Sequence, residues 1–109
     1  MSYQTLKLET NNHVATITLG RPEMMNAFNE QLIWDMGEAT KIVKDDSQIR
    51  VLVITGEGRG FTAGADLTER ESSWSNTKDA LERGYHPFLK NIIDMPKPVI
   101  GSINGAAAG

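Results

Sequence analysis

The sequence has no cysteine, only 6% aromatic residues and no long apolar run. Without cysteine the chain forms no disulfide, no thiolate metal site and no cysteine nucleophile. No window approaches the roughly 20 apolar residues that a membrane-spanning helix needs, and residues 1–4 lack the basic and apolar regions of a signal peptide. We therefore expect a cytoplasmic protein without a membrane span.

An excess of positive charge is also missing. The 109 residues contain 11 Lys and Arg against 14 Asp and Glu, a formal net charge of -3, and the basic residues are scattered. A nucleic-acid-binding surface gathers positive charge against phosphates, so we expect no nucleic-acid partner. A chain of this length forms one small domain at most.

Alternating apolar and polar residues predict that the chain opens with an antiparallel hairpin. Residues 4–9 and 13–19 both alternate, as strands with one buried face do. Asn11-Asn12 lies between them and tolerates the positive φ of a tight turn. The buried faces are expected to be Leu6 and Leu8 in the first strand and Ala15, Ile17 and Leu19 in the second.

Two helical patterns follow the hairpin. Asn29 suits the N-cap of a helix that begins at Glu30, because its side chain can accept a hydrogen bond from a free N–H of the first turn. Residues 81–93 form a second apolar stripe at helical spacing, in which Pro87 should cause a kink or a fresh start. The polar stretch 68–76 is expected to be an exposed and mobile connection.

Two short runs, 51–54 and 99–103, are apolar on both faces and predict parallel strands covered on both sides. Glycine-rich segments, 56–66 and 105–109, follow these runs. Loops at the carboxyl ends of adjacent parallel strands meet where ligands bind, and free N–H groups from two such loops form an oxyanion hole. Taken alone, either segment is also explained as an ordinary glycine turn. A nucleotide cradle is disfavoured, since the G-x-G-x-x-G spacing and the Walker ending are absent.

Other candidate catalytic residues are weaker. His13 and His86 lie far apart without the partners of a triad or metal site, and surface positions are favoured for both. Acidic residues in polar stretches are expected on solvated faces, because an acid or base needs burial or a charged neighbour to tune its pKa. These residues are Glu57, Glu69, Glu71 and Glu82.

Three groups of residues then occur in order along the chain. They are Arg21-Pro22 with Asn26-Ala27; Val53-Ile54-Thr55-Gly56 with Arg59-Gly60-Phe61-Thr62-Ala63-Gly64-Ala65-Asp66-Leu67; and Pro96-Lys97-Pro98-Val99-Ile100 with Asn104-Gly105. From about Tyr3 to its last residue the chain therefore resembles the enoyl-CoA hydratase/isomerase (crotonase) superfamily. The resemblance implies an α/β fold, a spiral of ββα units, of which residues 1–109 are the N-terminal part of a single domain, incomplete at the C-terminus.

The resemblance also implies the chemistry. Such lyases and isomerases of fatty acid metabolism bind an acyl-CoA thioester and stabilise its enolate in an oxyanion hole, with CoA entering only as part of the substrate and no metal. Ala65 carries over as the first N–H donor and hence as a catalytic residue. Ala63 and Gly64 line the path of the adenine and pantetheine, and Leu67 borders the acyl pocket. The family assembles as trimers or hexamers.

Further site residues follow from the same resemblance. Gly109 matches the residue just before the second donor. Met24-Met25 stands where many relatives have a basic or alanine-leucine pair, so ion pairing is weakened there, and Met25 is expected to contact the nucleotide. Asp66 belongs to the binding turn, and as an acidic residue before Leu67 we expect it to cap a short helix. Trp74 is a candidate to cover the acyl pocket or a neighbouring subunit.

Two functions remain open. In the first, the residues belong to an acyl-CoA hydratase or isomerase, and residues 1–109 are inactive alone because the second donor and the acid and base of hydratases lie beyond Gly109 in the resemblance. The alternative is a non-catalytic CoA-binding or assembly module that needs a partner chain.

Overall fold

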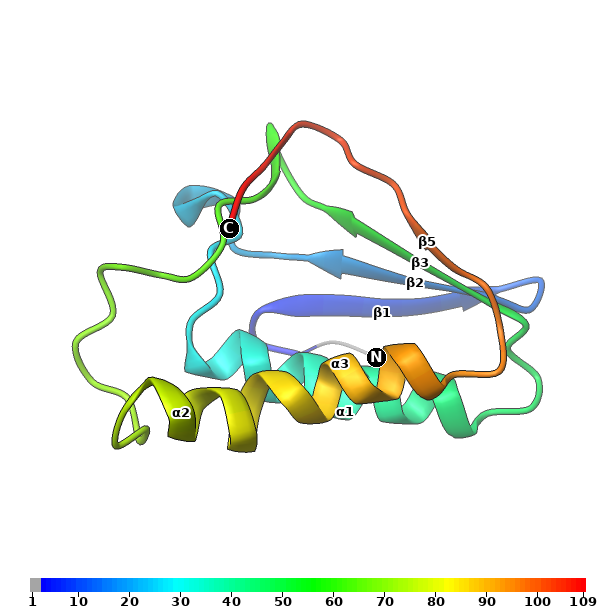
Figure 1. The fold of residues 1–109 in the computed structure, drawn as a ribbon. Helices are drawn as coiled ribbons and strands as arrows, with labels where there is room; N and C mark the ends of the chain where they lie inside the picture. Colours follow the sequence, from blue (N-terminus) through cyan, green and yellow to red (C-terminus); the bar gives the residue numbers. More distant parts are fainter. Residues whose placement is uncertain (1–2) are drawn as a thin grey trace.

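The computed structural model describes residues 3–109, in which four strands form a mixed sheet with α1 and α3 on one face (Figure 1). The strand order is β1 (Leu6–Asn11), β2 (Val14–Leu19), β3 (Val51–Gly56) and β5 (Val99–Gly101). β1 and β2 are antiparallel, whereas β2, β3 and β5 are parallel. The predicted α/β class, a hairpin followed by parallel strands, is confirmed.

The hairpin differs from the prediction in its turn. Positive φ values occur at Asn12 (49°) and His13 (67°), one residue later than expected. The alternation itself is confirmed, because the second strand buries its predicted face almost completely. Exposure is 0% for Ala15, 0% for Ile17 and 1% for Leu19.

The helix α1 (Glu30–Asp45) begins where the sequence predicts. The Asn29 side chain accepts a hydrogen bond from the Leu32 N–H at 2.9 Å. At the other end the Lys97 ammonium donates to the carbonyls of Val43 (2.6 Å) and Asp46 (2.9 Å). Helix ends leave carbonyls without intrahelical partners, so Lys97 caps α1 from a distant loop.

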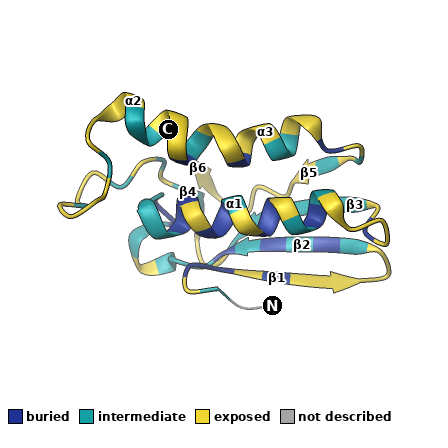
Figure 2. Cartoon of the chain, turned by 90° about the horizontal axis from the view of Figure 1, so that it is seen from below, coloured by how far each residue is buried: buried dark blue, intermediate teal, exposed yellow. Residues whose placement is uncertain are grey.

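The second helical region is interrupted, and only part of its predicted stripe is buried. It consists of α2 (Thr77–Ala80), a π-helical turn (Leu81–Tyr85) and α3 (His86–Asp94), with Pro87 in the first turn of α3. The junction residues keep a right-handed helical backbone, so Pro87 lies where the helix type changes and not at a fresh start. Phe88 is buried, but much of α3 is exposed (Figure 2), including Leu89 at 43% and Ile93 at 79%.

The expectation that 51–54 and 99–103 are covered on both sides is wrong for the part of the chain that the structure describes. Leu52 is buried, but the remaining β3 residues are partly exposed, and Ile100 is 52% exposed. The predicted strand 99–103 ends at Gly101. The reason is that both long helices lie on the same face of the sheet (Figure 1).

Candidate functional site

The two glycine-rich segments meet at the end of the sheet where β3 finishes. The first forms β4 (Gly60–Thr62), which pairs in parallel with β6 (Ala106–Ala107) from the second. The Ala108 N–H also donates to the Thr62 carbonyl at 3.0 Å. Figure 1 shows the C-terminal segment beside the loop after β3. The predicted meeting of two loops is therefore present in the structure.

Gly64 and Gly109 touch through their backbones. Both have positive φ, 86° and 132°, and a Cβ added at Gly64 would lie 2.8 Å from the Gly109 Cα. Real Cβ atoms do not approach a backbone atom so closely, so glycine alone permits this contact. The structure thus brings together two predicted site residues that are 45 positions apart in the sequence.

Two asparagine side chains hold the first glycine-rich loop in place, one from before the loop in the sequence and one from after it. Asn26, which is fully buried, donates to the carbonyls of Glu57 (3.0 Å), Gly60 (3.1 Å) and Phe61 (3.0 Å). Asn104 accepts from the Gly56 N–H at 3.1 Å and donates to the carbonyls of Gly58 and Gly60. The loop shape is therefore set by side-chain amides.

The Ala65 N–H is left without an acceptor among residues 3–109. Phe28 and Ala65 form an isolated parallel bridge, in which the Phe28 N–H donates to the Gly64 carbonyl at 2.7 Å and the Asp66 N–H donates to the Phe28 carbonyl at 2.9 Å. These two bonds use the groups on either side of Ala65. Since successive N–H groups of an extended chain alternate in direction, the Ala65 N–H points away from Phe28.

Asp66 does not cap a helix, and that prediction is wrong: among the described residues no helix begins at Leu67. One carboxylate oxygen accepts from the Thr68 hydroxyl (2.6 Å) and N–H (2.9 Å), and the other pairs with Arg21 at 3.1 Å. The Arg21 guanidinium also donates to the Ala27 carbonyl. The pKa of Asp66 is lowered, and the largest cause is the hydrogen bond from the Thr68 hydroxyl. Burial acts in the opposite direction, whereas the Thr68 N–H and Arg21 lower the pKa further. Asp66 therefore ties the turn to the segment before α1.

A pocket of about 210 Å³ opens beside Ala65. Its lining comes from the segment before α1, from α1 itself, from the turn at Ala65 and Asp66, and from the residues leading into α3. The residues are Phe28, Ile33, Ala65, Asp66, Glu69, Trp74, Thr77, Ala80 and Tyr85. Trp74 is half-buried and contributes to this lining, and its role as a cover of the acyl pocket or of a neighbouring subunit stays a prediction.

The segment 68–76 is attached to the start of α1. The Glu30 carboxylate accepts from the Ser73 N–H (2.6 Å) and hydroxyl (2.5 Å), and the Glu69 carboxylate accepts from the Glu30 N–H at 3.1 and 3.2 Å. Burial opposes ionisation of Glu30, but the bonds from Ser73 outweigh it and lower the pKa. The expectation of a solvated Glu69 is wrong, because this side chain is partly buried at the end of a helix.

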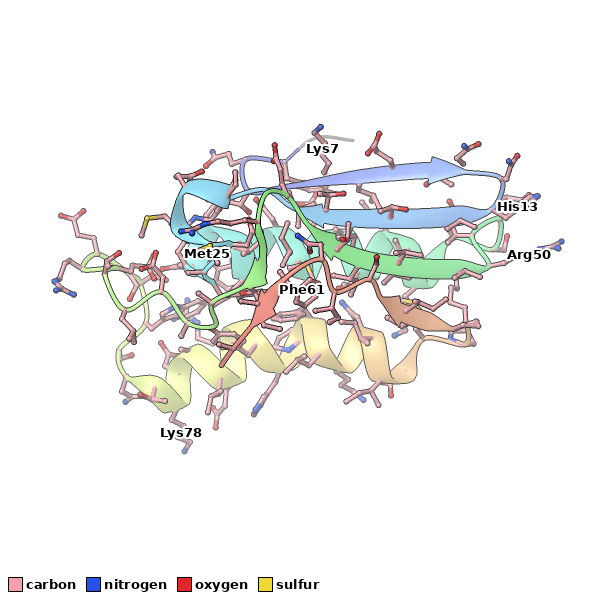
Figure 3. All side chains as sticks on the ribbon, turned by 90° about the horizontal axis from the view of Figure 1, so that it is seen from above. Lys7, His13, Met25, Arg50, Phe61 and Lys78 are labelled. Atoms are coloured by element: carbon pink, nitrogen blue, oxygen red, sulfur yellow. The ribbon has the colours of Figure 1, made fainter. Side chains whose placement is uncertain are left out.

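The remaining predicted residues are placed as follows. Met25 has a left-handed backbone (φ 53°), its side chain lies against Gly60, and its carbonyl accepts from the Ala63 N–H at 2.9 Å. Ala63 is exposed, and Leu67 is 87% exposed and outside the pocket lining. The roles of Met25 and Ala63 toward CoA and of Leu67 at the acyl pocket stay predictions. Figure 3 shows Met25 and Phe61 at the site end of the sheet and His13 at the opposite end.

Sequence reasoning missed how the site is held together. The family resemblance includes Arg21, Asn26 and Asn104 but gives none of their hydrogen-bond partners. The available signal was the presence of amide and guanidinium side chains beside glycine-rich loops, whose backbone groups need acceptors and donors.

Within residues 3–109, no three His, Asp or Glu side chains are placed to hold a metal ion. No helix in that range is long and apolar enough to cross a membrane.

Solved structures show the class of fold to which this chain belongs. The crystal structure of an enoyl-CoA hydratase from Mycobacterium avium subsp. paratuberculosis K-10 matches the whole chain with a TM-score of 0.83 and 25% identity, over 42% of that protein. An enoyl-CoA hydratase from Mycobacterium marinum matches 93% of the chain with a TM-score of 0.74 and 36% identity, over 48% of that protein. The fold is that of the crotonase-type hydratases.

Relatives found by sequence similarity point to the same family as the solved structures. An Escherichia coli K12 protein named 1,2-epoxyphenylacetyl-CoA isomerase is 43% identical over 88% of this chain, and a probable enoyl-CoA hydratase of Rhodobacter capsulatus is 38% identical over 100% of it. Residues 9–109 match the enoyl-CoA hydratase/isomerase family. The chain belongs to that family, and it spans 38% and 42% of the lengths of these two relatives.

Proposed function

We propose that this protein acts on acyl-CoA thioesters as a hydratase or isomerase, with the Ala65 N–H as one donor to the thioester enolate. The observation that carries the proposal is the Ala65 N–H, which has no acceptor among residues 3–109, in a turn that the Phe28 bridge fixes and that contributes Ala65 to the lining of the pocket. Family membership supports the substrate class.

The chemistry follows from charge development. When a proton leaves the carbon next to a thioester, negative charge gathers on the carbonyl oxygen. A fixed N–H donor stabilises that charge without reorganising during the reaction, and one such donor contributes about 3 kcal/mol to lowering the barrier. Ala65 offers this donor because its neighbours in the turn carry the structural hydrogen bonds instead.

The second donor is proposed to follow Gly109. Gly64 immediately precedes Ala65, and Gly109 lies against Gly64, so the residue after Gly109 would begin close to the first donor. Residues 1–109 alone are proposed to be inactive, because the hydratase acid and base also lie beyond Gly109 in the family resemblance.

The remaining features are proposed with the function. CoA is part of the substrate, and no other cofactor is bound permanently. The complete protein works in the cytoplasm as a homotrimer or a dimer of trimers. Exposed apolar side chains of Ile93 (79%), Ile100 (52%) and Ile103 (57%) support burial against further polypeptide.

The test removes the donor. In the complete polypeptide that contains these residues, Ala65→Pro deletes the N–H, whereas Ala65→Gly keeps it. With a 2-enoyl-CoA substrate we expect kcat to fall about 10²- to 10³-fold for Ala65→Pro and by only a few fold for Ala65→Gly. Circular dichroism checks that both variants fold. Equal turnover by the two folded variants would contradict the proposal.

The alternative is a non-catalytic CoA-binding or assembly module. It predicts that the complete polypeptide binds CoA thioesters without converting any 2-enoyl-CoA, and that a second chain co-purifies with it in fixed stoichiometry. Turnover by the polypeptide alone would exclude this alternative.

A further inference from the structure

We propose that the acyl group held beside Ala65 carries an aromatic ring. The inference rests on the proposed function, because it assumes that the thioester lies at the Ala65 N–H, and it goes further by naming the class of acyl group.

The pocket beside Ala65 is lined by aromatic side chains from separate segments. Phe28 precedes α1, Trp74 precedes α2, and Tyr85 ends the π-helical turn. The chain has only 7 aromatic residues, the sum of 2 Trp, 2 Tyr and 3 Phe, and three of them line this one pocket. Apolar Ile33 and Ala80 add to the lining.

These rings already pack against one another in the geometry that aromatic pairs prefer, and a further ring could join them in the same geometry. The centroids of Phe28 and Tyr85 are 6.3 Å apart with an interplanar angle of 36°, and both rings contact Phe88, at 5.9 and 6.0 Å. Aromatic pairs prefer offset or tilted arrangements with centroids about 4.5 to 7 Å apart. A ligand ring beside Phe28 and Tyr85 would join this cluster, whereas an alkyl chain gains only its buried area.

The size of the pocket suits a ring. An engineered apolar cavity of about 150 Å³ binds benzene. The pocket beside Ala65 measures about 210 Å³, which leaves space for a ring and a short link to the thioester.

The lining is held in position without a ligand. Phe28 is fixed by its two backbone bonds to the Ala65 turn. The Trp74 ring packs on Trp34 at 5.1 Å and lies under the Arg83 guanidinium at 5.2 Å. Gly84 leaves room for Trp74, because a Cβ there would lie 2.9 Å from that ring. A preformed pocket avoids the ordering penalty that weakens binding to mobile side chains.

The two carboxylates in the lining are engaged elsewhere. Asp66 pairs with Arg21 and Thr68, and Glu69 accepts from the Glu30 N–H. Their charges therefore face protein donors, which leaves the aromatic wall compatible with an uncharged ring.

The experiment compares two acyl groups with the same number of carbon atoms. Calorimetry on the complete polypeptide that contains these residues measures Kd for phenylacetyl-CoA, octanoyl-CoA and CoA alone. We expect phenylacetyl-CoA to bind about tenfold more tightly than octanoyl-CoA. Equal or weaker binding of phenylacetyl-CoA overturns the inference. If neither thioester binds more tightly than CoA, the proposed function fails as well, so the two failures are distinct.

Matched variants test whether the preference for phenylacetyl-CoA arises from the aromatic residues of this pocket. Tyr85→Leu removes a ring from the pocket, and Tyr3→Leu removes the same ring type from a partly buried position outside the lining. The tenfold preference should fall to about twofold or less in Tyr85→Leu and persist in Tyr3→Leu and Tyr85→Phe. Trp74→Leu is the second test, in case Tyr85→Leu does not fold. Persistence of the full preference in folded Tyr85→Leu or Trp74→Leu overturns the inference.

Discussion

The body of the sheet and the end that carries the site are stabilised by different interactions. Between the sheet and α1, apolar side chains such as Ile17, Leu32 and Leu52 are 0% exposed. At the site end, amide side chains of Asn26 and Asn104 bond to backbone groups of a glycine-rich loop. Apolar packing makes a stable layer but leaves backbone groups unpaired where chains bend. Directional bonds can fix the position of a single N–H, which the proposed role of Ala65 requires.

The largest effect is expected where packing alone acts. Leu52→Ala deletes a fully buried side chain from the centre of the sheet and should lower the free energy of unfolding by about 4 kcal/mol, since a cavity remains. Leu67→Ala, at 87% exposure, should change it by less than about 0.5 kcal/mol. Urea denaturation of both variants measures the difference. A comparable loss in the two would mean that the core does not lie where the structure places it.

Asn26→Ala should distinguish the hydrogen-bonded site end from the apolar body of the sheet, because it should affect both stability and thioester binding. The change removes the amide donor of the Phe61 carbonyl, whereas the Gly60 carbonyl keeps its bond from Asn104, and it should cost about 2 to 3 kcal/mol because a partly buried carbonyl left unpaired loses solvation. Unlike Leu52→Ala, it should also weaken CoA-thioester binding. The exposed Asn11→Ala is the control for both readouts. Unchanged thioester binding in a folded Asn26→Ala protein would show that the loop does not depend on this amide.

Gly64→Ala tests the contact between the two glycine-rich segments. The positive φ of 86° and the approach of Gly109 predict a loss of about 1 to 2 kcal/mol, with weaker thioester binding. Gly37→Ala in α1 is a control of opposite sign, because nothing lies within 4 Å of its Cβ position and alanine should stabilise the helix by about 0.5 to 1 kcal/mol. Thermal unfolding compares them. The same sign for both would contradict the local geometry.

The smallest effect is a pH dependence at Asp66. Its pKa is lowered in the folded protein, first by the Thr68 hydroxyl and then by the Thr68 N–H and Arg21, against the effect of burial. A lowered folded pKa gives stability that is present above about pH 4, the unfolded value, and is lost as pH falls through the folded pKa. Asp66→Asn should therefore be less stable by about 1 kcal/mol at pH 7 and by less at pH 3, and the difference should shrink further as the pH falls through the folded pKa. Urea denaturation at both pH values measures this, and a constant difference would rule the linkage out.

Much of the fold was predictable from local patterns. The alternation of Ala15, Ile17 and Leu19 placed β2 correctly, and Asn29 marked the start of α1 to the residue. The burial of β3 and of the 81–93 stripe was predicted less well. Periodicity reports which side chains are apolar, and it does not report whether another element is present to cover them.

The site was predictable only in part. Glycine content and order along the chain indicated that two loops meet, and the structure shows Gly64 against Gly109. The role of Asp66 was wrong because a preference for helix N-caps was applied where an ion pair with Arg21, 45 positions earlier, satisfies the carboxylate instead. Such a pairing has no signature in local sequence.

The sequence by itself determined the strands, the start of α1 and the family to which the chain belongs, because these depend on side-chain periodicity, capping and residue order. Tertiary structure decided which backbone groups remain free. The Ala65 N–H is available because Phe28 takes up the groups on either side of it, and the aromatic wall exists because Phe28, Trp74 and Tyr85 are brought together from three segments. Hydrogen bonds and ring contacts between distant residues require the chain to close large loops, and that closure is a property of the whole fold.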